Sequence, residues 1–397
     1  MVTGDETLAG AARWTLDGAL GSQRDAFDVP PGVAYFNTSG LAPMLRSVRA
    51  AGEAALRRRA QPWAIGAEAW FEDVDRLRSL FAALVGGDPD GVALVPATSY
   101  GFAVAAGNLP VEPGQRILVL AEEYPSGVYS WRRRAAETGA EILTVTRAPG
   151  QAWAEAVLAA LDERVAVVSV PNVHWTDGSL VDLDAVAAGS REIGARLVVD
   201  ASQSLGAMPL DVATLRPDFL ICVGYKWLLG PFGRGYLWVA TEHRDGRPLE
   251  ENWISRAGSE DFSGLVDYRD AYQPGARRYD QGQRTLFELT PMAIAALEQL
   301  LAWGAERISA TLGQLTADIA GRVADRGLEA RPPEPRGPHI LGLGLPDRAR
   351  DQVVPALAAA NCYAALRGTT LRVSPHLHVV PDDVDRFVAA LAGALTR

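Results

Sequence analysis

An alternation of strand and helix signals between residues 92 and 239 most constrains the fold of this chain. Short apolar runs, such as 117–120, 165–170 and 197–199, are separated by longer stretches with the spacing of amphipathic helices. A run that is apolar at nearly every position is typical of a strand buried on both faces of a sheet. Repeated strand–helix units predict a mainly parallel sheet covered by helices, which is an α/β fold.

The segments on either side of this alternation complete the expected organisation. A short helical pattern lies around Leu8 to Leu20, and a helix is expected from about residue 291 toward residue 323. Residues 241–285 are polar and rich in Gly and Arg, which predicts a long functional loop. We expect three parts, namely an N-terminal segment, a large domain and a smaller α+β C-terminal domain, over residues 1–30, 31–290 and 291–397.

Length and composition argue against several classes of protein. A chain of 397 residues is long enough for two domains with sizeable cores. The net charge of −10 argues against nucleic acid or an anionic membrane as a partner, and no apolar run is long enough to span a bilayer. Cys222 and Cys362 lie in apolar segments and the N-terminus lacks a signal-peptide pattern, so we expect a cytoplasmic protein without disulfides. The sequence has no CxxC, no HExxH and no cluster of His and Cys, so no metal site is expected.

Lys226 is the only lysine in the chain, and arginine accounts for the other 37 of the 38 basic residues. A position that stays lysine under this bias needs a property that arginine lacks. Arginine is never deprotonated in proteins, whereas a lysine amine can lose its proton and attack a carbonyl group, as in the formation of a Schiff base. The alternative, a lysine left by chance on a solvated surface, fits poorly with the apolar residues around it at 221–229.

Asp200 ends the apolar run 197–199, which we interpret as a buried parallel strand. Open α/β sheets bind their ligands at the carboxyl ends of such strands. A Schiff-base lysine with an acid on the pyridinium nitrogen is the signature of pyridoxal 5'-phosphate (PLP), because the carboxylate keeps that nitrogen protonated and the ring able to accept electrons. Gln203 is placed to reach the phenolic oxygen of the ring. Taken alone, Asp200 is equally compatible with a helix cap.

A turn at 97–101 follows a predicted strand and opens a predicted helix. The hydroxyl groups of Thr98 and Ser99 and the free N–H groups of such a turn suit a phosphate, although Ser and Thr also cap helices without any ligand. Tyr225 is expected to add a hydroxyl group to the phosphate, with core packing as the alternative. Tyr124 follows another strand and is the best candidate to lie flat on the cofactor ring, with surface packing as the alternative.

Together these residues make the chain resemble the fold-type I PLP-dependent enzymes and, within them, the class V aminotransferase family. The most specific match is the run 200–203 followed by 224–226, and the resemblance extends from Tyr35 to the last helix. The family includes cysteine desulfurases, selenocysteine lyases, kynureninases and isopenicillin N epimerase. The resemblance implies a large domain with a mainly parallel seven-stranded sheet, a smaller α+β C-terminal domain, and a homodimer with its sites at the interface.

The resemblance also implies how single residues bind the cofactor. Thr98 and Ser99 match the family's phosphate-binding turn, and Tyr124 matches its ring-stacking residue. Gly282 and Gln283 match the loop that reaches the phosphate of the neighbouring subunit.

The substrate side of the site is expected to draw on four further residues. Arg372 matches the family's carboxylate-binding arginine, since a guanidinium group can hold a carboxylate in a two-pronged pair. Asn37 lies in the first segment that the resemblance covers and is expected to bind substrate. His174 and Trp175 follow the end of another predicted strand and are expected to line the pocket.

The chain departs from one branch of the family. Desulfurases carry a nucleophilic cysteine on a loop shortly before the carboxylate-binding arginine, but residues 364–370 contain no cysteine, and Cys362 lies in a predicted strand. Tyr124 and Tyr225 stand where desulfurases have histidine. A desulfurase that forms a cysteine persulfide is therefore not expected, and the chain resembles the epimerase and kynureninase side of the family more closely.

The resemblance implies a reaction at Cα of an amino acid. Lys226 holds the cofactor as an aldimine, is freed by the substrate and acts as general base, and Asp200 stabilises the quinonoid. The carbanion can then lose a β-substituent, be epimerised or be transaminated. We favour a β-eliminating lyase of the C–S type or an epimerase, with a class V aminotransferase as the alternative. A PLP-fold binding protein without catalysis and a nucleotide-binding α/β protein using the turn at Thr98 are further alternatives.

Overall fold

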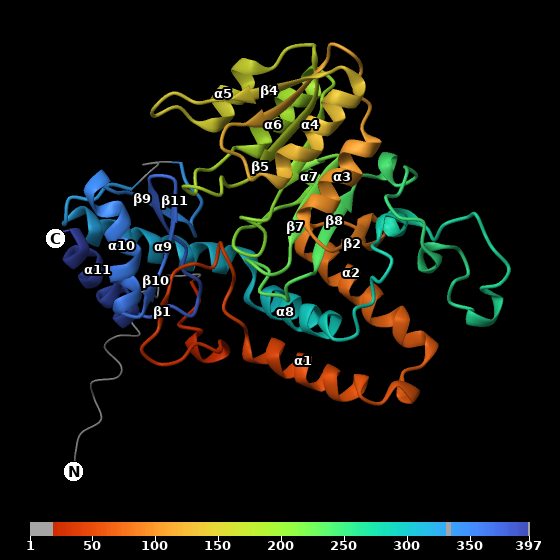
Figure 1. Cartoon of the computed structure of the whole chain (residues 1–397), viewed down its shortest axis with the longest axis horizontal. Helices are drawn as coiled ribbons and strands as arrows, with labels where there is room; N and C mark the ends of the chain where they lie inside the picture. The colour runs from red at the N-terminus through yellow and green to blue at the C-terminus, as the bar shows by residue number, and fades with distance from the viewer. Residues whose placement is uncertain (1–18, 331–334, 396–397) are drawn as a thin grey trace.

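The computed structural model describes residues 19–330 and 335–395, and a seven-stranded sheet forms its centre (Figure 1). The helical pattern around Leu8 to Leu20 falls almost wholly outside the described residues. The sheet comprises β2 (Val92–Val95), β3 (Arg116–Leu120), β4 (Glu141–Val145), β5 (Val165–Pro171), β6 (Arg196–Asp200), β7 (Phe219–Val223) and β8 (Gly235–Val239). The strand order is β2-β8-β7-β6-β5-β3-β4. Because only β8 runs antiparallel to its neighbours, the predicted mainly parallel α/β fold is confirmed.

Helices cover both faces of this sheet. They include α3 (Thr98–Asn108), α4 (Ser126–Thr138), α5 (Trp153–Ala160), α6 (Leu183–Glu192) and the short α7 (Val212–Leu215). Alternate strand side chains enter different hydrophobic cores, because successive residues of a strand point to opposite faces. Val198 belongs to the core that contains Phe102 of α3 and Trp131 of α4, whereas its neighbour Val199 belongs to the core that contains Val186 of α6.

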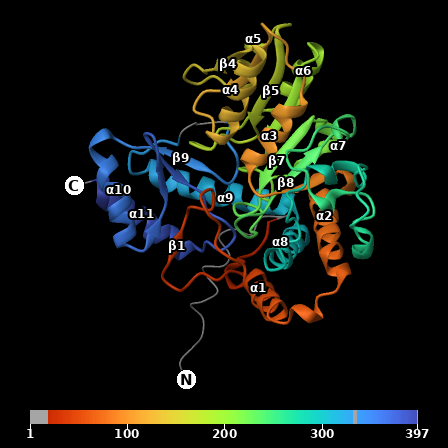
Figure 2. The ribbon, with the colours of Figure 1, turned by 45° about the vertical axis from the view of Figure 1, so that its right-hand side comes forward.

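Three further helices lie beside the β2 end of the sheet. Helix α8 (Leu289–Trp303) packs against both α1 (Arg46–Arg59) and α2 (Glu72–Val85) (Figure 2). Helix α9 (Ala305–Ala324) follows α8 directly. The sequence predicted one helix from about residue 291 toward 323, but Gly304 adopts φ +82° and ψ +130°, which interrupts the helical path and turns α9 away from α8.

The C-terminal part of the chain forms a smaller α+β unit. Its antiparallel sheet has the order β11-β12-β9, made of β11 (Ala365–Arg367), β12 (Thr370–Val373) and β9 (Leu341–Gly344). The helices α10 (Arg350–Ala359) and α11 (Pro381–Leu395) pack on each other beside it. Strand β1 (Ala34–Tyr35) pairs in parallel with β10 (Cys362–Tyr363), so the start of the described chain joins the C-terminal unit. The predicted domain boundary at residue 290 stays a proposal.

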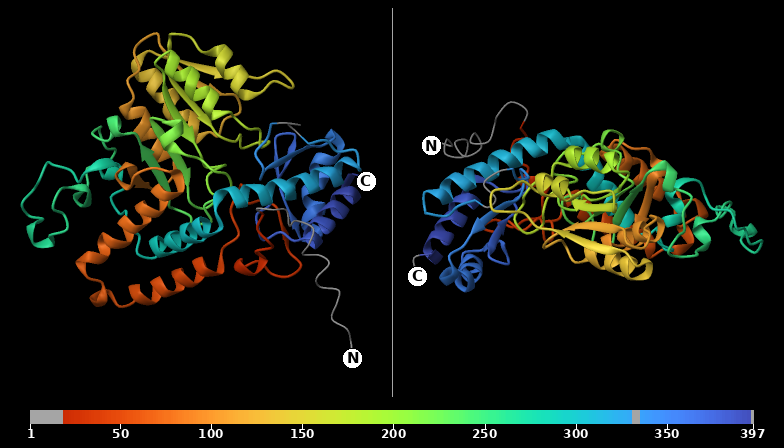
Figure 3. Two further views of the ribbon diagram at one scale, coloured as in Figure 1. Left: turned by 180° about the vertical axis from the view of Figure 1, so that it is seen from behind. Right: turned by 90° about the horizontal axis from the view of Figure 1, so that it is seen from above.

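The predicted long loop over residues 241–285 extends away from the β2 side of the sheet (Figures 1 and 3). Within it, the described regular structure consists of short 3₁₀ turns, at Thr241–His243, Trp253–Ser255, Phe262–Gly264 and Gly275–Tyr279. None of the helices in the described ranges combines the length and apolar character that crossing a membrane requires.

Candidate active site

A cavity opens at the carboxyl ends of β3, β5, β6 and β7, the edge at which open α/β sheets bind ligands. Its lining residues come from the last residues of β5, β6 and β7, from the segments that follow these strands and β3, and from the first turn of α3. They are Thr98, Glu123, Tyr124, Pro171, Val173, Trp175, Asp200, Ser202, Gln203, Val223, Tyr225 and Lys226. The cavity therefore brings together seven residues that the sequence singled out, from five separate segments.

Lys226 lies in this cavity with only 7% of its surface exposed. Burial lowers the pKa of its amine to about 8, although the nearby charge of Asp200 acts in the opposite direction. The Nζ atom lies 5.2 Å from the centre of the Tyr124 ring and 5.9 Å from that of Tyr225. An amine that gives up its proton near neutral pH and sits between aromatic rings is suited to form a Schiff base with a flat aldehyde.

The turn that carries Lys226 depends on a close backbone approach at Gly224. A Cβ atom there would lie 2.8 Å from the carbonyl oxygen of Arg234, so a larger side chain would clash with backbone. The carbonyl oxygen of Gly224 accepts a hydrogen bond from Gly230 N at 2.8 Å, which closes the turn around the lysine. This geometry keeps Lys226 directed to the sheet edge where Asp200 ends β6.

Asp200 is buried at the end of β6, and burial raises the pKa of its carboxyl group. Its Oδ1 atom accepts a hydrogen bond from Ser202 N at 2.8 Å. This one hydrogen bond offsets little of the free-energy cost of burying a charged carboxylate. A cationic partner in the cavity would offset more of that cost. A protonated pyridine nitrogen meets that requirement, so the residues present fit PLP.

Gln203 and the start of α3 supply the polar groups for the other edges of such a ring. The Gln203 side chain is fixed, because its Nε2 donates to Ser39 O at 3.2 Å and its Oε1 accepts from Trp227 Nε1 at 2.9 Å. One Nε2 hydrogen is left for a ligand. The N-cap residue of α3 is Ala97, which has no capping group, so Thr98 is the first helical residue and the helix N-terminus is suited to an anion.

Three substrate residues that the sequence predicted meet at the edge of the cavity. Arg372, on β12 and only 1% exposed, donates from Nη1 to Trp175 O at 2.7 Å and from Nη2 to Asn37 Oδ1 at 3.4 Å. Burial, together with the positive charge of Arg367, lowers the pKa of Arg372 to about 9. Trp175 in turn contacts the Tyr124 ring edge-on, with 5.7 Å between ring centres. Asn37, Trp175 and Arg372 are therefore linked to the cofactor side of the site.

Several predicted residues do not line the cavity, although all of them lie in the described part of the chain. They are Asn37, Ser99, His174, Gly282, Gln283 and Arg372. Ser99 is exposed at the start of α3. The His174 ring is buried, stacks on Trp153 and is hydrogen-bonded to Thr176 Oγ1 at 2.7 Å and Ala121 O at 3.1 Å. These contacts make His174 a support for the loop that carries Trp175 rather than part of the cavity wall.

Gly282 and Gln283 lie in a segment that is anchored to β2. Gln281 N donates to Leu94 O at 3.0 Å, and Gly282 N donates to Glu250 Oε2 at 2.7 Å. The predicted role of this segment concerns a neighbouring subunit and stays a prediction.

Glu123 is a cavity residue that the sequence reading missed. Burial, reinforced by the charge of Asp200, raises the pKa of its carboxyl group to about 8. Its Oε1 atom accepts a hydrogen bond from Tyr124 N at 2.6 Å. The position carried a usable signal, because Glu123 follows the end of β3 as Asp200 ends β6, and polar residues at such strand ends are ligand candidates.

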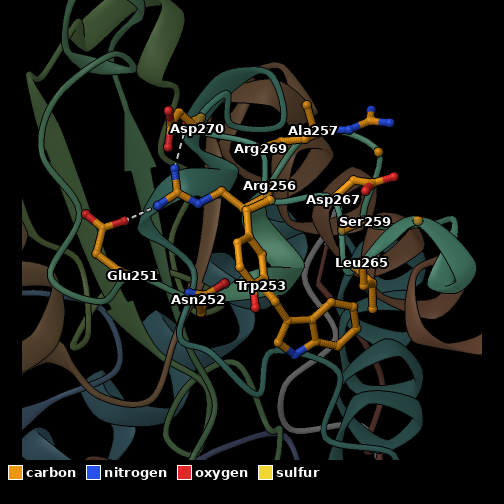
Figure 4. A pocket seen from close by; sticks show the side chains of 13 residues that line it. Glu251, Asn252, Trp253, Arg256, Ala257, Ser259, Leu265, Asp267, Arg269 and Asp270 are labelled. Atoms are coloured by element: carbon orange, nitrogen blue, oxygen red, sulfur yellow. Dashed lines mark hydrogen bonds and ion pairs between the residues drawn. The ribbon is translucent and has the colours of Figure 1, made fainter.

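Two other polar groups in the described chain are separate from this cavity. Asp218, Glu242 and His243 lie close enough together to hold a metal ion, but His243 Nε2 already contacts Asp218 Oδ1 at 2.6 Å, and Arg196 pairs with Asp218 at 3.3 Å. A pocket within residues 251–270 is built around Arg256 (Figure 4). There Arg256 pairs with Glu251 and donates to Asp270 O, which accounts for its charge within the segment.

Known proteins resemble this chain in sequence and in fold. The chain is 26% identical to the uncharacterised aminotransferase YcbU of Bacillus subtilis over 327 residues, which cover 81% of this chain and 85% of YcbU. It is 28% identical to isopenicillin N epimerase of Streptomyces clavuligerus over 343 residues, which cover 79% of this chain and 82% of the epimerase. A solved structure of the cystine C-S lyase C-DES, a mutant with glycine covalently linked to PLP, matches with a TM-score of 0.84 and 18% identity over 93% of this chain and 99% of that chain.

The description of the family model that matches this chain is Aminotransferase class-V, and the match spans residues 64–386. The members of this family are PLP-dependent enzymes, so the expected enzyme class and cofactor are confirmed. The chain belongs to the class V aminotransferase family.

Proposed function

We propose that this enzyme removes a β-substituent from an amino acid, as a lyase of the C–S type, or epimerises an amino acid at Cα. The observation that carries the proposal is the buried pair of Lys226 and Asp200 at the carboxyl ends of adjacent parallel strands. When bound there, PLP supplies an electron sink for the bonds of the substrate's Cα. A β-elimination and an epimerisation both begin with loss of the Cα proton.

In this proposal each residue of the site has one task. Lys226 would hold the cofactor and would serve as the base for the Cα proton, since its pKa of about 8 leaves part of the amine unprotonated at neutral pH. Asp200 would pair with the ring nitrogen, and Tyr124 would offer its aromatic face to the ring. The N-terminus of α3 at Thr98 takes the phosphate, and Arg372 takes the α-carboxylate of the substrate.

The two cysteines support the proposal against a desulfurase that forms a persulfide. A thiolate is the nucleophile in such chemistry, and burial of a thiol opposes its formation. Both Cys222 and Cys362 are buried free thiols. Burial raises the pKa of Cys362 to about 11 and also raises that of Cys222. Residues 364–370 offer no replacement.

We also propose a cytoplasmic homodimer in which Gly282 and Gln283 approach the phosphate bound by the partner subunit. The anchoring of this segment to β2 supports the proposal, because it keeps the two residues at a fixed position near the large sheet without entering the cavity of their own chain. Light scattering of the cofactor-loaded protein gives the mass in solution. A monomeric mass at micromolar concentration would contradict the dimer.

The cofactor linkage is tested first, with purified protein and its Lys226→Ala variant. The wild type is expected to show the visible absorbance band of lysine-bound PLP, and the variant to lose it. Because the chain has no other lysine, no second side chain can restore the band in the variant. A band that persists in the Lys226→Ala protein would contradict the proposed linkage.

Products then distinguish the reactions. Pyruvate and ammonia released from cysteine conjugates, without added keto acid, would establish β-elimination. Exchange of the Cα hydrogen in deuterium oxide with a change of configuration would establish epimerisation. Amino transfer that depends on a keto acid would instead identify an aminotransferase, and a PLP-loaded protein without turnover or exchange across the panel would support the inactive binding protein.

A further inference from the structure

We propose that the substrate is an amino acid with a second acidic group on its side chain, a carboxylate or a comparable oxyanion, and that Arg367 binds this group. The inference rests on the proposed function, since it assigns the substrate class of the site built around Lys226. It comes from a pair of arginines beside the cavity, of which the sequence reading recognised only Arg372.

Arg367 and Arg372 reach the same tryptophan from neighbouring strands. In the β11–β12 pair, Arg367 lies opposite Thr370 and Arg372 lies opposite Ala365. The guanidinium of Arg367 lies over the Trp175 ring, 5.7 Å from its centre, while Arg372 donates to the Trp175 carbonyl oxygen at 2.7 Å. Both cations therefore lie beside the residue that forms one wall of the Lys226 cavity.

The three positive groups act on one another electrostatically. The charge of Arg367 lowers the pKa of Arg372, and the charges of both arginines lower the pKa of Lys226. Lys226 and Arg372 are buried and Arg367 is partly buried, and such a concentration of positive charge is unfavourable unless an anion compensates it. In the whole chain, acidic residues outnumber basic ones, 48 to 38, so negative side chains are not scarce.

Within residues 19–330 and 335–395, however, no carboxylate forms an ion pair with Arg367 or Arg372. The Nε atoms of both arginines are buried without a hydrogen-bond partner among these residues. Arg78 and Arg284 are fully buried, like Arg372, and their Nε atoms also lack a hydrogen-bond partner in the described chain, but both of these arginines pair with the carboxylate of Asp280. The missing negative charges at Arg367 and Arg372 therefore point to a ligand.

One α-carboxylate matches one guanidinium in a two-pronged pair and leaves the second cation unmatched. Arg372 is the more deeply buried of the two and is fixed by Trp175 and Asn37, which suits the invariant part of an amino-acid substrate. Arg367 lies over the Trp175 ring, 5.7 Å from its centre, and the Trp175 ring in turn contacts that of Tyr124 edge-on. This arrangement assigns Arg367 to the side chain of the substrate.

The test measures binding as well as turnover. Calorimetric titration of the PLP-loaded enzyme compares succinate with butyrate, and glutarate with valerate, so that each pair differs in one carboxylate. We expect the dicarboxylates to bind about 10- to 100-fold more tightly, which is the gain in affinity that one charge-assisted hydrogen-bonded pair contributes. The Arg367→Gln variant is expected to lose this preference while still binding the monocarboxylates, and Arg367→Lys is expected to keep part of it. Arg348→Gln removes an exposed arginine of the same unit and serves as the control, with the preference unchanged.

Steady-state turnover provides a second, independent measurement. S-carboxymethyl-cysteine is compared with its uncharged amide, and wild type is expected to favour the acid in kcat/KM by a similar factor, which Arg367→Gln abolishes. Equal affinity of the wild type for mono- and dicarboxylates would overturn the inference. An equal loss of affinity for mono- and dicarboxylates in Arg367→Gln would also overturn it, because both arginines would then bind one carboxylate. Failure of the proposed function has a different signature, namely no absorbance band that depends on Lys226.

Discussion

The amine of Lys226 lies 5.2 Å from the centre of the Tyr124 ring, although the two residues are carried by turns after different strands, β7 and β3. A flat cofactor held by the lysine therefore has an aromatic surface within reach. The ring of Tyr124 is itself braced edge-on by Trp175, so its orientation is set before any ligand binds. Such prior ordering reduces the cost of binding, because the ring does not have to be immobilised when the cofactor arrives.

Replacing Tyr124 should therefore weaken PLP binding in proportion to the aromatic surface lost. Tyr124→Ala is expected to raise the dissociation constant of PLP about tenfold, since an aromatic pair contributes ~0.5–1.5 kcal/mol beyond its buried area. Tyr124→Phe keeps the ring and is expected to bind PLP within about twofold of wild type. Titration of apoprotein with PLP, followed by absorbance, measures both. An alanine variant with wild-type affinity would show that the ring does not stack on the cofactor.

The single lysine makes its own titration measurable. In apoprotein labelled with ¹³C at lysine Cε, the chain gives one lysine side-chain signal, because Lys226 is its only lysine. Burial lowers the pKa of this amine to about 8, so the signal should titrate near pH 8 and the unprotonated fraction should increase with pH through that value.

Asp200→Asn provides the matched variant for this titration. The charge of Asp200 raises the pKa of Lys226, so its removal should move the midpoint to lower pH. A wild-type midpoint above pH 10 would mean that the amine is solvated, and it would contradict the burial on which the proposed chemistry depends.

Glu123 should make the apoprotein lose stability as the pH rises. Its pKa is raised from 4.5 to about 8 by burial and by Asp200, so the folded state keeps a proton that the unfolded state releases between these values. The resulting contribution is fully present below about pH 4.5 and is lost as the pH rises through about 8. Glu123→Gln keeps the size of the side chain and removes the titrating group. The melting temperature of the variant should therefore increase relative to that of wild type as the pH rises from 6 to 8.5. A constant difference across this range would show that Glu123 is ionised in the folded protein.

The strands, and several of the residues that line the cavity, were predictable because their signals are local. Each strand of the large sheet is a short run of apolar residues, and Asp200 and Lys226 stand out by type and position within a few residues. The role of Arg367 has no such signal. It is one of 37 arginines, and its proposed role depends on Trp175, which is distant in the sequence, and on the lack of an ion-pairing carboxylate among the residues that the structure describes.

Other features were missed for related reasons. The interruption between α8 and α9 rests on one glycine whose backbone angle no pattern of apolar residues reveals. The parallel pairing of β1 with β10 joins two-residue strands from opposite ends of the chain, which is too short a run for periodicity to detect. The position of His174 outside the cavity wall depends on the packing of its ring on Trp153.

Asp280 is expected to be essential for stability. Its Oδ1 atom accepts hydrogen bonds from Leu94 N at 2.8 Å and Arg78 Nη1 at 3.0 Å, and its Oδ2 pairs with Arg284 at 2.8 Å. Burial acts to raise the pKa of this carboxyl group, but the guanidinium groups of Arg78 and Arg284 hold it below the usual range. Asp280→Asn removes the buried anion of both arginines and leaves Arg78 its longer contact with the exposed Asp75 at 3.5 Å, which should lower the free energy of unfolding by about 3–5 kcal/mol.

A surface pair gives the control for this prediction. Asp245 pairs with Arg278 at 2.8 Å, but its side chain is 95% exposed, so Asp245→Asn should change the stability by less than about 1 kcal/mol. Urea denaturation of the three proteins measures both differences. Because Asp280 directly precedes the segment that holds Gly282 and Gln283 on β2, Asp280→Asn should also weaken the proposed dimer, which light scattering detects. Equal stabilities of the Asp280→Asn and Asp245→Asn proteins would show that the buried arginines find other compensation.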